Sequence, residues 1–194
     1  MRRFVFNLRS PGATARGEAR SFEAVILPHL DAAYNLARFL TRDPAVSEDV
    51  VQDAMLRAFR SFDQFRGESP RAWLLAIVRN CCRSAMTARS AAGLHLVAEI
   101  AESSEREADS ADNPEQALIR VCDAARVREM VEALPEPFRE AIVLRELEEL
   151  SYREIVQVTG VAMGTVMSRI SRGRAMIAEQ LTSRADQERS RNEQ

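Results

Sequence analysis

The sequence predicts an all-α protein made of two small helical domains joined by a flexible acidic linker, with a helix-turn-helix in the second domain. Apolar residues recur at helical spacing in both halves, and no segment shows the strict alternation of a half-buried strand. Between the halves, residues 91–112 carry six acidic side chains, one Arg and no aromatic residue, a composition typical of a linker. Near the C-terminus a short capped helix, a glycine turn and an Arg-bearing helix follow one another, as in a helix-turn-helix.

The N-terminal domain, residues 22–90, contains three predicted helices. They lie near residues 22–41, 45–61 and 70–89. The first break falls at Arg42-Asp43-Pro44, and the second falls at residues 66–70. Ser69 followed by Pro70 is a typical N-cap with proline at the first helical position, so we expect the third helix to begin there.

The C-terminal domain, residues 113–184, contains four predicted helices. They lie near residues 113–133, 137–147, 151–159 and 164–181, and a polar tail, residues 185–194, follows. Asn113-Pro114 opens the first helix, and the prolines of residues 134–137 end it. Ser151 and Glu154 form a capping-box pattern at the start of the third helix, and Gly160 forms the turn before the fourth.

The net charge of −2 does not fit a uniformly basic DNA-binding domain. All 27 basic residues are Arg, against 29 acidic residues. Any DNA site must therefore be a local Arg patch, and its affinity depends on a partner. Residues 1–21 form an Arg-rich tail without the apolar stretch of a signal peptide, and we expect this tail to be disordered.

Composition excludes several classes of protein. No apolar run approaches the ~18–20 residues that a membrane span needs, so we expect no membrane insertion. Three Cys (Cys81, Cys82 and Cys122) cannot build a disulfide framework, which favours reduced thiols in the cytoplasm, although a redox sensor at the adjacent pair is an alternative. No phosphate loop, catalytic triad or zinc-ligand spacing occurs, so we expect neither an enzyme nor a cofactor or metal.

The last predicted helix has the side-chain pattern of a DNA recognition helix. Its inward face holds Val166, Ile170, Gly173 and Ile177, at ~100° per residue. The opposite stripe consists of Thr165, Ser168 and Arg172, with Arg169 and Arg174 on its flanks. Residues 164–178 contain three Arg and no acid, whereas a merely solvated helix usually mixes charges of both signs. Short polar groups and Arg suit base edges, and flanking Arg suits phosphates.

The chain resembles the sigma-70 family of RNA polymerase initiation factors, in its extracytoplasmic-function (ECF) group. In the C-terminal half the resemblance rests on GTVMSRISRGRAMI and on the preceding LPEPFREAIVLRELEELSYREIVQVTG. In the N-terminal half it rests on SEDVVQDAMLRAF and FDQFRGESPRAWLLAIVRN. The resemblance covers about residues 22–89 and 113–181. It implies a factor that binds core RNA polymerase, directs it to promoters through −35 and −10 elements, and assists melting.

The second predicted helix carries the surface that the resemblance assigns to polymerase. Asp49, Gln52, Asp53 and Leu56 share one face, at positions i, i+3, i+4 and i+7. A Leu among acids on an outward face suggests a partner surface, although periodicity alone also fits a solvated face. The resemblance implies that this face binds the clamp helices of the β′ subunit, with the β subunit as a further partner. It also implies an anti-sigma factor.

The resemblance places recognition of the −10 element on the 70–89 helix and the loop before it. The residues concerned are Phe65, Arg66, Trp73, Arg79, Asn80 and Arg83. Arg79 and Arg83 lie opposite the apolar side of their helix at i, i+4, and an aromatic ring could stack on an unpaired base. Core packing is the alternative role for Phe65 and Trp73.

The sequence departs from the family pattern at a few positions. Ser84 stands where relatives usually have Asp, and Thr87-Ala88 replaces a basic pair. Val156 stands in the helix-turn-helix where Ala is frequent. Two other functions compete with an ECF sigma factor. One is a stand-alone helix-turn-helix regulator with an N-terminal dimerisation or sensing bundle, and the other is an adaptor that sequesters a regulator.

Overall fold

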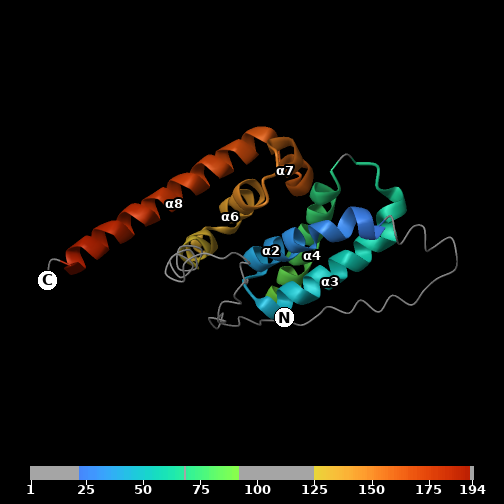
Figure 1. Cartoon of the computed structure of the whole chain (residues 1–194), viewed down its shortest axis with the longest axis horizontal. Coiled ribbons are helices and arrows are strands. Elements are labelled where there is room, and N and C mark those ends of the chain that lie inside the picture. The colour runs from blue at the N-terminus through green and yellow to red at the C-terminus, as the bar shows by residue number, and fades with distance from the viewer. Residues whose placement is uncertain (1–21, 68, 92–124, 193–194) are drawn as a thin grey trace, which may run out of the picture.

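A computed structural model describes residues 22–67, 69–91 and 125–192, and these residues form an all-helical fold (Figure 1). The predicted tail at residues 1–21 lies outside the described residues. So do all of the predicted linker except residue 91, and the beginning of the helix expected from Asn113. Cys122 lies outside them as well.

The N-terminal domain is a bundle of three long helices with short 3₁₀ turns. Its elements are a helical turn at 22–26, η1 (Leu27–His29), α2 (Leu30–Thr41), α3 (Pro44–Ser61), η2 (Phe62–Gln64) and α4 (Pro70–Ala91). The predicted continuous helix over 22–41 is wrong, since a 3₁₀ turn interrupts it. Pro28 explains this break, because proline lacks the backbone N–H that a helix interior needs.

Both predicted breaks in the N-terminal domain are found, and each is capped, at Ser69 as expected and at Asp43 without having been predicted. Arg42 ends α2 in the left-handed region with φ 58°, and Asp43 accepts a hydrogen bond from the Val46 amide at 3.2 Å. Ser69 Oγ accepts a hydrogen bond from the Ala72 amide at 3.3 Å, so Ser69 caps α4. These caps set the points at which α3 and α4 begin.

The C-terminal domain contains the predicted helix-turn-helix. After a helix at 125–133 come α6 (Glu136–Ile142), the π-helical η3 (Val143–Leu147), α7 (Tyr152–Thr159) and α8 (Met163–Asn192). Ser151 and Glu154 form a complete capping box at the start of α7. Gly160 ends α7 with φ 71°, a conformation that favours glycine.

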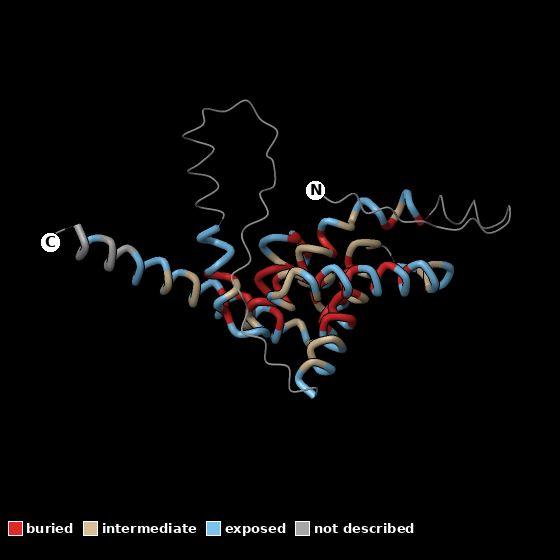
Figure 2. The backbone as a smooth tube through the Cα atoms, turned by 90° about the horizontal axis from the view of Figure 1, so that it is seen from below, coloured by how far each residue is buried: buried red, intermediate tan, exposed pale blue. Residues whose placement is uncertain are grey.

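α8 continues beyond its predicted end near Leu181. No glycine or proline follows that residue to stop the helix, and α8 extends away from the rest of the molecule as an exposed arm (Figures 1 and 2). The described part of the expected polar tail, residues 185–192, is therefore helical.

The buried apolar residues form one cluster that spans both domains (Figure 2). α4 packs against α7, and α2 packs against α6. α8 packs against α6 at Gly173, where a Cβ atom would lie 2.6 Å from Ile142 Cγ1. Only glycine permits this close approach, which holds the recognition helix against the domain core.

Candidate DNA and polymerase interfaces

The first half of α8 has the predicted division into inward and outward faces. Val166, Ile170 and Gly173 are buried. The outward stripe of Thr165, Ser168 and Arg172 is exposed, and Arg169 on its flank is partly buried. Ser168 Oγ donates to the Thr165 carbonyl at 3.0 Å. The C-terminal domain therefore holds these polar groups exposed on a firmly packed helix.

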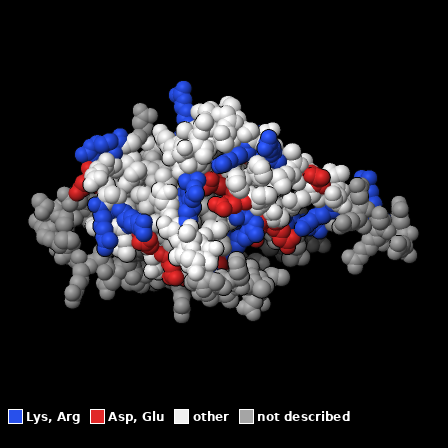
Figure 3. Space-filling view, turned by 180° about the vertical axis from the view of Figure 1, so that it is seen from behind, with Lys and Arg blue, Asp and Glu red and all other residues white. Residues whose placement is uncertain are grey.

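Arg174, on the other flank of α8, already has a carboxylate partner. Its Nε and Nη2 donate to Glu146 Oε1 at 3.0 and 2.6 Å. Both side chains are about half exposed, so the pair contributes little stability and can exchange for another anion. Arg and acidic side chains are interspersed over one face of the molecule, consistent with the acidic net charge (Figure 3).

Contacts of Arg145 join η3 to the beginning of α7. Arg145 donates to the Leu150 carbonyl at 2.8 Å and lies 5.1 Å from the centre of the Tyr152 ring. Val156, the departure from the family pattern, is half-buried and packs against the core. The larger side chain is thus accommodated within the helix-turn-helix.

The predicted polymerase face of α3 is exposed along its length. Its members are Asp49, Gln52, Asp53 and Leu56. Leu56 is 46% exposed and lies among the exposed polar side chains of this face. Asp53 forms an i, i+4 ion pair with Arg57 at 2.8 Å. The structure thus brings the four residues together on one accessible surface.

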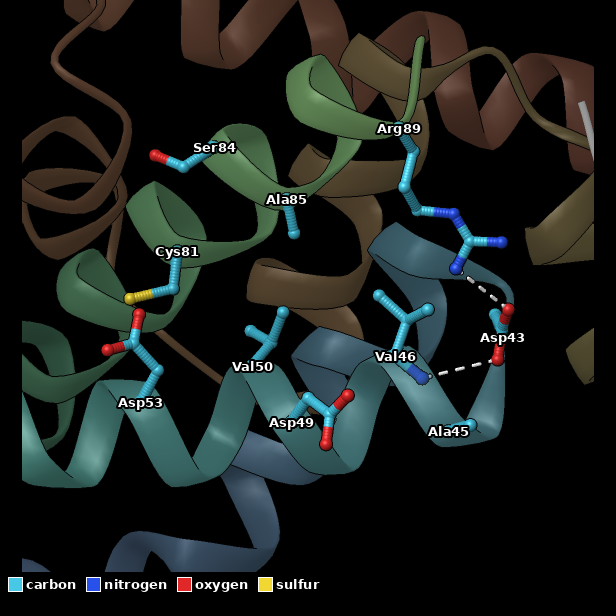
Figure 4. Close-up of a pocket in the computed structure, with 10 residues that line it drawn as sticks. All are labelled: Asp43, Ala45, Val46, Asp49, Val50, Asp53, Cys81, Ser84, Ala85 and Arg89. Carbon is cyan, nitrogen blue, oxygen red and sulfur yellow. Dashed lines mark hydrogen bonds and ion pairs between the residues drawn. The ribbon is translucent and has the colours of Figure 1, made fainter. Parts of the chain in front are cut away.

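A groove of about 600 Å³ runs between α3 and α4 beside this face (Figure 4). Asp49 and Asp53 lie on its rim, and Val50 and Ala85 contribute apolar lining. At one end Arg89 pairs with Asp43 at 3.0 Å. Although burial opposes ionisation of Asp43, hydrogen bonds from the Val46 amide and from Arg89 hold the pKa of Asp43 below its ordinary value. The groove is therefore apolar at its floor and acidic at its rim.

Cys81 and Cys82 are free and buried. Burial raises the pKa of Cys81 to about 11 and that of Cys82 to about 12. Reactive redox cysteines need thiolate character and exposure, and neither is found here at neutral pH. The pair is better explained as small apolar packing residues of α4.

The aromatic side chains near the −10 candidates form a continuous row. Phe22 meets Phe59 and Phe62 edge-on, with ring centres 5.3 Å apart in both pairs. Phe65 stacks on Phe62 at 6.4 Å and lies 5.1 Å from Trp73. Phe65 and Trp73 are half-buried, so they serve the core and still present an edge to the surface.

The polar −10 candidates occupy two different environments. Arg66, Asn80 and Arg83 are exposed, and Arg66 donates to the carbonyls of Asp63 and Phe65 at 2.5 and 2.9 Å. Arg79 is instead 8% exposed, because the C-terminal domain covers it. The outward, solvent-facing position predicted for Arg79 on α4 is therefore wrong, because Glu140 of the C-terminal domain covers and pairs with its guanidinium.

The sequence reasoning missed Arg71, which lies on α4 beside the domain boundary and pairs with Glu148. Arg79 likewise pairs with a carboxylate of the C-terminal domain, that of Glu140. Helical phase places Arg79 away from the apolar side of α4, so the sequence pattern does not indicate this pairing.

Among the described residues, no group of three or more His, Cys, Asp or Glu side chains could hold a metal ion. None of their helices combines the length and the apolar character that crossing a membrane requires.

Comparison with known proteins matches both halves of the chain. Two family models match, Sigma-70 region 2 over residues 25–92 and Sigma-70 region 4 over residues 124–177. The RNA polymerase sigma-H factor of Pseudomonas aeruginosa is 34% identical over 171 residues, which cover 86% of this chain and 89% of that protein. The ECF RNA polymerase sigma-E factor of Haemophilus influenzae is 33% identical over 172 residues, covering 86% of this chain and 90% of that protein.

A solved structure shares the arrangement of both domains. It is the sigma factor RpoE from Bartonella quintana in complex with the anti-sigma factor NepR. Its TM-score is 0.66 at 28% identity, and the match covers 84% of this chain and 98% of that one.

Matches to two sigma-70 regions, one of them over the helix-turn-helix of the C-terminal domain, define a protein of transcription initiation. The chain belongs to the ECF group of the sigma-70 family of RNA polymerase sigma factors. Because both halves match sigma-factor regions, the stand-alone helix-turn-helix regulator is not favoured.

Proposed function

We propose that this chain selects promoters for core RNA polymerase through contacts that are divided between its two domains. The C-terminal domain contacts the −35 element, and the N-terminal domain binds polymerase, contacts the −10 element and assists melting. The observation that carries the proposal is the exposed polar stripe of α8, held against the core by Val166 and Ile170. Arg172 and its short polar neighbours suit base edges, and Arg169 and Arg174 suit phosphates.

The exposed face of Asp49, Gln52, Asp53 and Leu56 is the proposed contact with the β′ clamp helices. Its carboxylates suit Arg side chains of a partner, and the exposed Leu56 suits an apolar contact at the centre of an interface. The neighbouring groove adds apolar lining to the same surface. The β subunit is a further partner in this proposal.

For the −10 element, the exposed Arg66, Asn80 and Arg83 would contact the DNA strand, with Arg79 joining them when it is uncovered. The half-buried rings of Phe65 and Trp73 lie close enough to present a stacking surface to an unpaired base. Their packing against the core supports such a role, since a fixed ring loses less freedom on binding.

Three further properties follow from the same proposal. The chain acts in the cytoplasm, where core polymerase and DNA are. It binds and positions rather than catalyses. Because RpoE from Bartonella quintana is found in complex with the anti-sigma factor NepR, an anti-sigma factor is also proposed for this chain.

Run-off transcription with purified core polymerase tests the proposal. The templates are promoter fragments with randomised −35 and −10 positions. We expect the chain to select a subset of templates with core polymerase and to bind the same duplexes poorly alone. Tight duplex binding without polymerase, together with no transcription, would contradict it.

The polymerase face is tested separately with the double variant Asp49→Arg/Gln52→Ala. We expect the affinity for core polymerase to fall about 30-fold, which corresponds to about 2 kcal/mol for an interface hot spot. The matched control is Asp31→Arg, which makes the same charge change at an exposed site on α2. Circular dichroism verifies that both variants keep their helicity. Equal affinities for both variants would remove this face from the interface.

A further inference from the structure

The groove between α3 and α4 has an acidic rim that its neighbours neutralise only in part (Figure 4). Asp49 and Asp53 lie one helical turn apart on this rim, and like charges at that spacing repel each other. Asp53 pairs with Arg57, but both side chains are about half exposed, so the pair is readily exchanged. Asp49 has no ion-pair partner among the described residues. The rim therefore favours a ligand that carries guanidinium groups.

The floor of the same groove is apolar. Its lining includes Val46, Val50 and Ala85, and the exposed Ser84 on the α4 side adds only a small side chain. An apolar centre with charges around it is the arrangement of a protein interface. The groove therefore suits a peptide segment in which apolar side chains are bordered by Arg.

The chain itself contains such a segment, in the tail that lies outside the described residues. Residues 2–9, RRFVFNLR, hold four apolar side chains, with two Arg before them and one Arg after them. Composition alone predicts a disordered tail, since so few apolar side chains cannot form a core of their own. The groove offers burial to these apolar side chains, and its carboxylates offer partners to the bordering Arg.

The tail joins the folded domain close to the groove. The ring centre of Phe22, the first described residue, lies 5.3 Å from that of Phe59 near the end of α3. Phe59 lies ~9 Å beyond Asp53 along the helix, and the groove continues about 15 Å from Asp53 to Asp43. The 12 residues of segment 10–21 can span ~40 Å. Residues 2–9 are therefore within reach of the whole groove.

We propose that residues 2–9 bind in the groove between α3 and α4 of the same chain. Their apolar side chains cover its floor, and their Arg side chains pair with Asp49 and Asp53. The inference rests on the proposed function, in which these two carboxylates contact polymerase, and adds that the tail of the chain competes for them. The tail is thus an internal inhibitor of polymerase binding, and polymerase displaces it.

Tethering makes a weak contact sufficient for this competition. A short flexible connection holds a segment near its site at an effective concentration of about 1 mM. A contact with a dissociation constant of about 0.1 mM then fills the groove in about 90% of the chains. Since polymerase binds only the remaining chains, freeing the groove should raise the affinity for polymerase about tenfold.

The first experiment locates the tail within the full chain by NMR. A nitroxide is attached at Ser84→Cys, beside the groove, in a Cys122→Ser background, while burial protects the two cysteines of α4 from the label. We expect the nitroxide to broaden the amide signals of residues 2–9. A nitroxide at Thr182→Cys, an exposed position on α8, is the matched control and should broaden them much less.

Substitutions on both sides of the contact show what holds the tail. Asp49→Asn/Asp53→Asn removes the charges of the rim, and Phe4→Ser/Phe6→Ser removes apolar side chains of the tail. Each variant should restore narrow signals for residues 2–9. A mixture in which the nitroxide and the observed amides lie on different molecules should show no broadening. Broadening in that mixture would mean that the tail binds a second copy of the chain, and would overturn the proposal.

The second experiment measures the affinity of the fluorescently labelled full chain for core polymerase. Arg2→Glu/Arg3→Glu should bind about tenfold more tightly than the wild type, because the tail no longer occupies the groove. The matched control is Arg16→Glu/Arg20→Glu, which makes the same charge change outside residues 2–9. Its affinity should change less than about twofold, since solvent screens charges that lie away from a contact.

Two further results would overturn the proposal. Signals of residues 2–9 that stay narrow beside the nitroxide at Ser84→Cys would show that the tail does not occupy the groove. Equal polymerase affinities of Arg2→Glu/Arg3→Glu and its control would show that the tail does not exclude polymerase. Failure of the proposed function is distinguishable, because the wild type would then have no measurable affinity for polymerase, whereas the NMR experiment involves no polymerase.

Discussion

The two domains hold their proposed DNA-contacting residues in opposite ways. In the C-terminal domain, Thr165, Ser168 and Arg172 are exposed on a helix whose inner face is buried. In the N-terminal domain, Arg79 is covered by the other domain and paired with Glu140. The proposed −35 contacts are thus accessible in this structure, whereas Arg79, a proposed −10 contact, is covered.

The exposed stripe of α8 bears on how strongly the chain binds DNA, whereas the cover over Arg79 bears on which proposed contacts DNA can reach. The acidic net charge of −2 disfavours DNA binding by the chain alone, even though the polar stripe of α8 is exposed. The cover over Arg79 keeps one proposed −10 contact from DNA in this structure. A covered Arg side chain does not bind DNA non-specifically, so the acidic chain can carry such residues and still depend on polymerase for DNA binding.

The packing that holds the polar stripe of α8 exposed depends most on Gly173, and replacing Gly173 has the largest expected effect. In Gly173→Ala the new Cβ would lie 2.6 Å from Ile142 Cγ1, so α8 must shift from α6. We expect the free energy of unfolding to fall by about 1–3 kcal/mol, as for an overpacked core. Affinity for a −35 duplex in holoenzyme should fall with it.

Gly164→Ala provides the matched control on the same helix. No atom lies within 4 Å of the Cβ position at Gly164, so the substitution should be neutral or stabilise by up to about 1 kcal/mol. Thermal unfolding followed by circular dichroism measures both variants. Equal stabilities would show that the contact between α6 and α8 does not position the recognition helix.

The next largest effects are expected for Arg172 and Arg174, which should contribute to DNA binding in different ways. Arg172→Ala should lose about 1–3 kcal/mol of binding and relax preference at one or two −35 positions, because Arg172 faces away from the core. Arg174→Ala should weaken all promoters evenly and reduce the salt dependence by about one unit, as expected for one phosphate contact. Transcription from a library with randomised −35 positions, at several salt concentrations, distinguishes the two.

Reversed outcomes for the two variants would reverse their assignment. The pairing of Arg174 with Glu146 suggests a further control, Glu146→Gln, which frees Arg174 without removing it. That variant should strengthen binding at every promoter alike. Promoter use that is unchanged in all three variants would show that α8 does not contact DNA.

Local signals in the sequence were sufficient for most of the fold. Caps at Ser69 and Ser151 were predicted because each depends on one side chain and the next turn of backbone. The two faces of α8 were predicted because helical phase alone sorts its residues. The break at Pro28 was missed because the apolar spacing continues across it.

The cover over α4 could not be predicted from one helix considered alone. Whether Arg79 is exposed depends on a domain that begins more than thirty residues later in the chain, and helical phase carries no information about such contacts. The π-helical η3 was also missed, since its hydrogen bond from the Glu148 amide to the Val143 carbonyl, at 2.9 Å, depends on packing. Tertiary contacts thus determine the burial of Arg79 and the π-helical turn, which local sequence patterns do not predict.

The smallest expected effect concerns the covered side, at Glu154, where α7 meets the N-terminal end of α4. The Ser69 hydroxyl, with the Ser151 hydroxyl and amide and the charge of Arg71, outweighs burial and holds the pKa of Glu154 below its ordinary value of 4.5. Ionised Glu154 therefore stabilises the folded chain, in which the two domains are in contact, and this contribution is complete above pH 4.5. It is lost as pH falls through the lowered pKa.

Glu154→Gln should accordingly lower the free energy of unfolding by no more than about 1 kcal/mol at pH 6, and the difference from the wild type should shrink as pH falls below 4.5. Urea unfolding, followed by the fluorescence of the single tryptophan, Trp73, on α4, measures this difference. Ser69→Asp separates the contact between domains from the cap. Aspartate still caps α4 but places a second carboxylate against Glu154. The free energy of unfolding should therefore be lowest near neutral pH, and it should recover as one of the two carboxylates takes up a proton. If Ser69→Asp keeps the pH dependence of the wild type, the lowered pKa of Glu154 arises within the capping box, and the Ser69 hydroxyl does not couple the two domains.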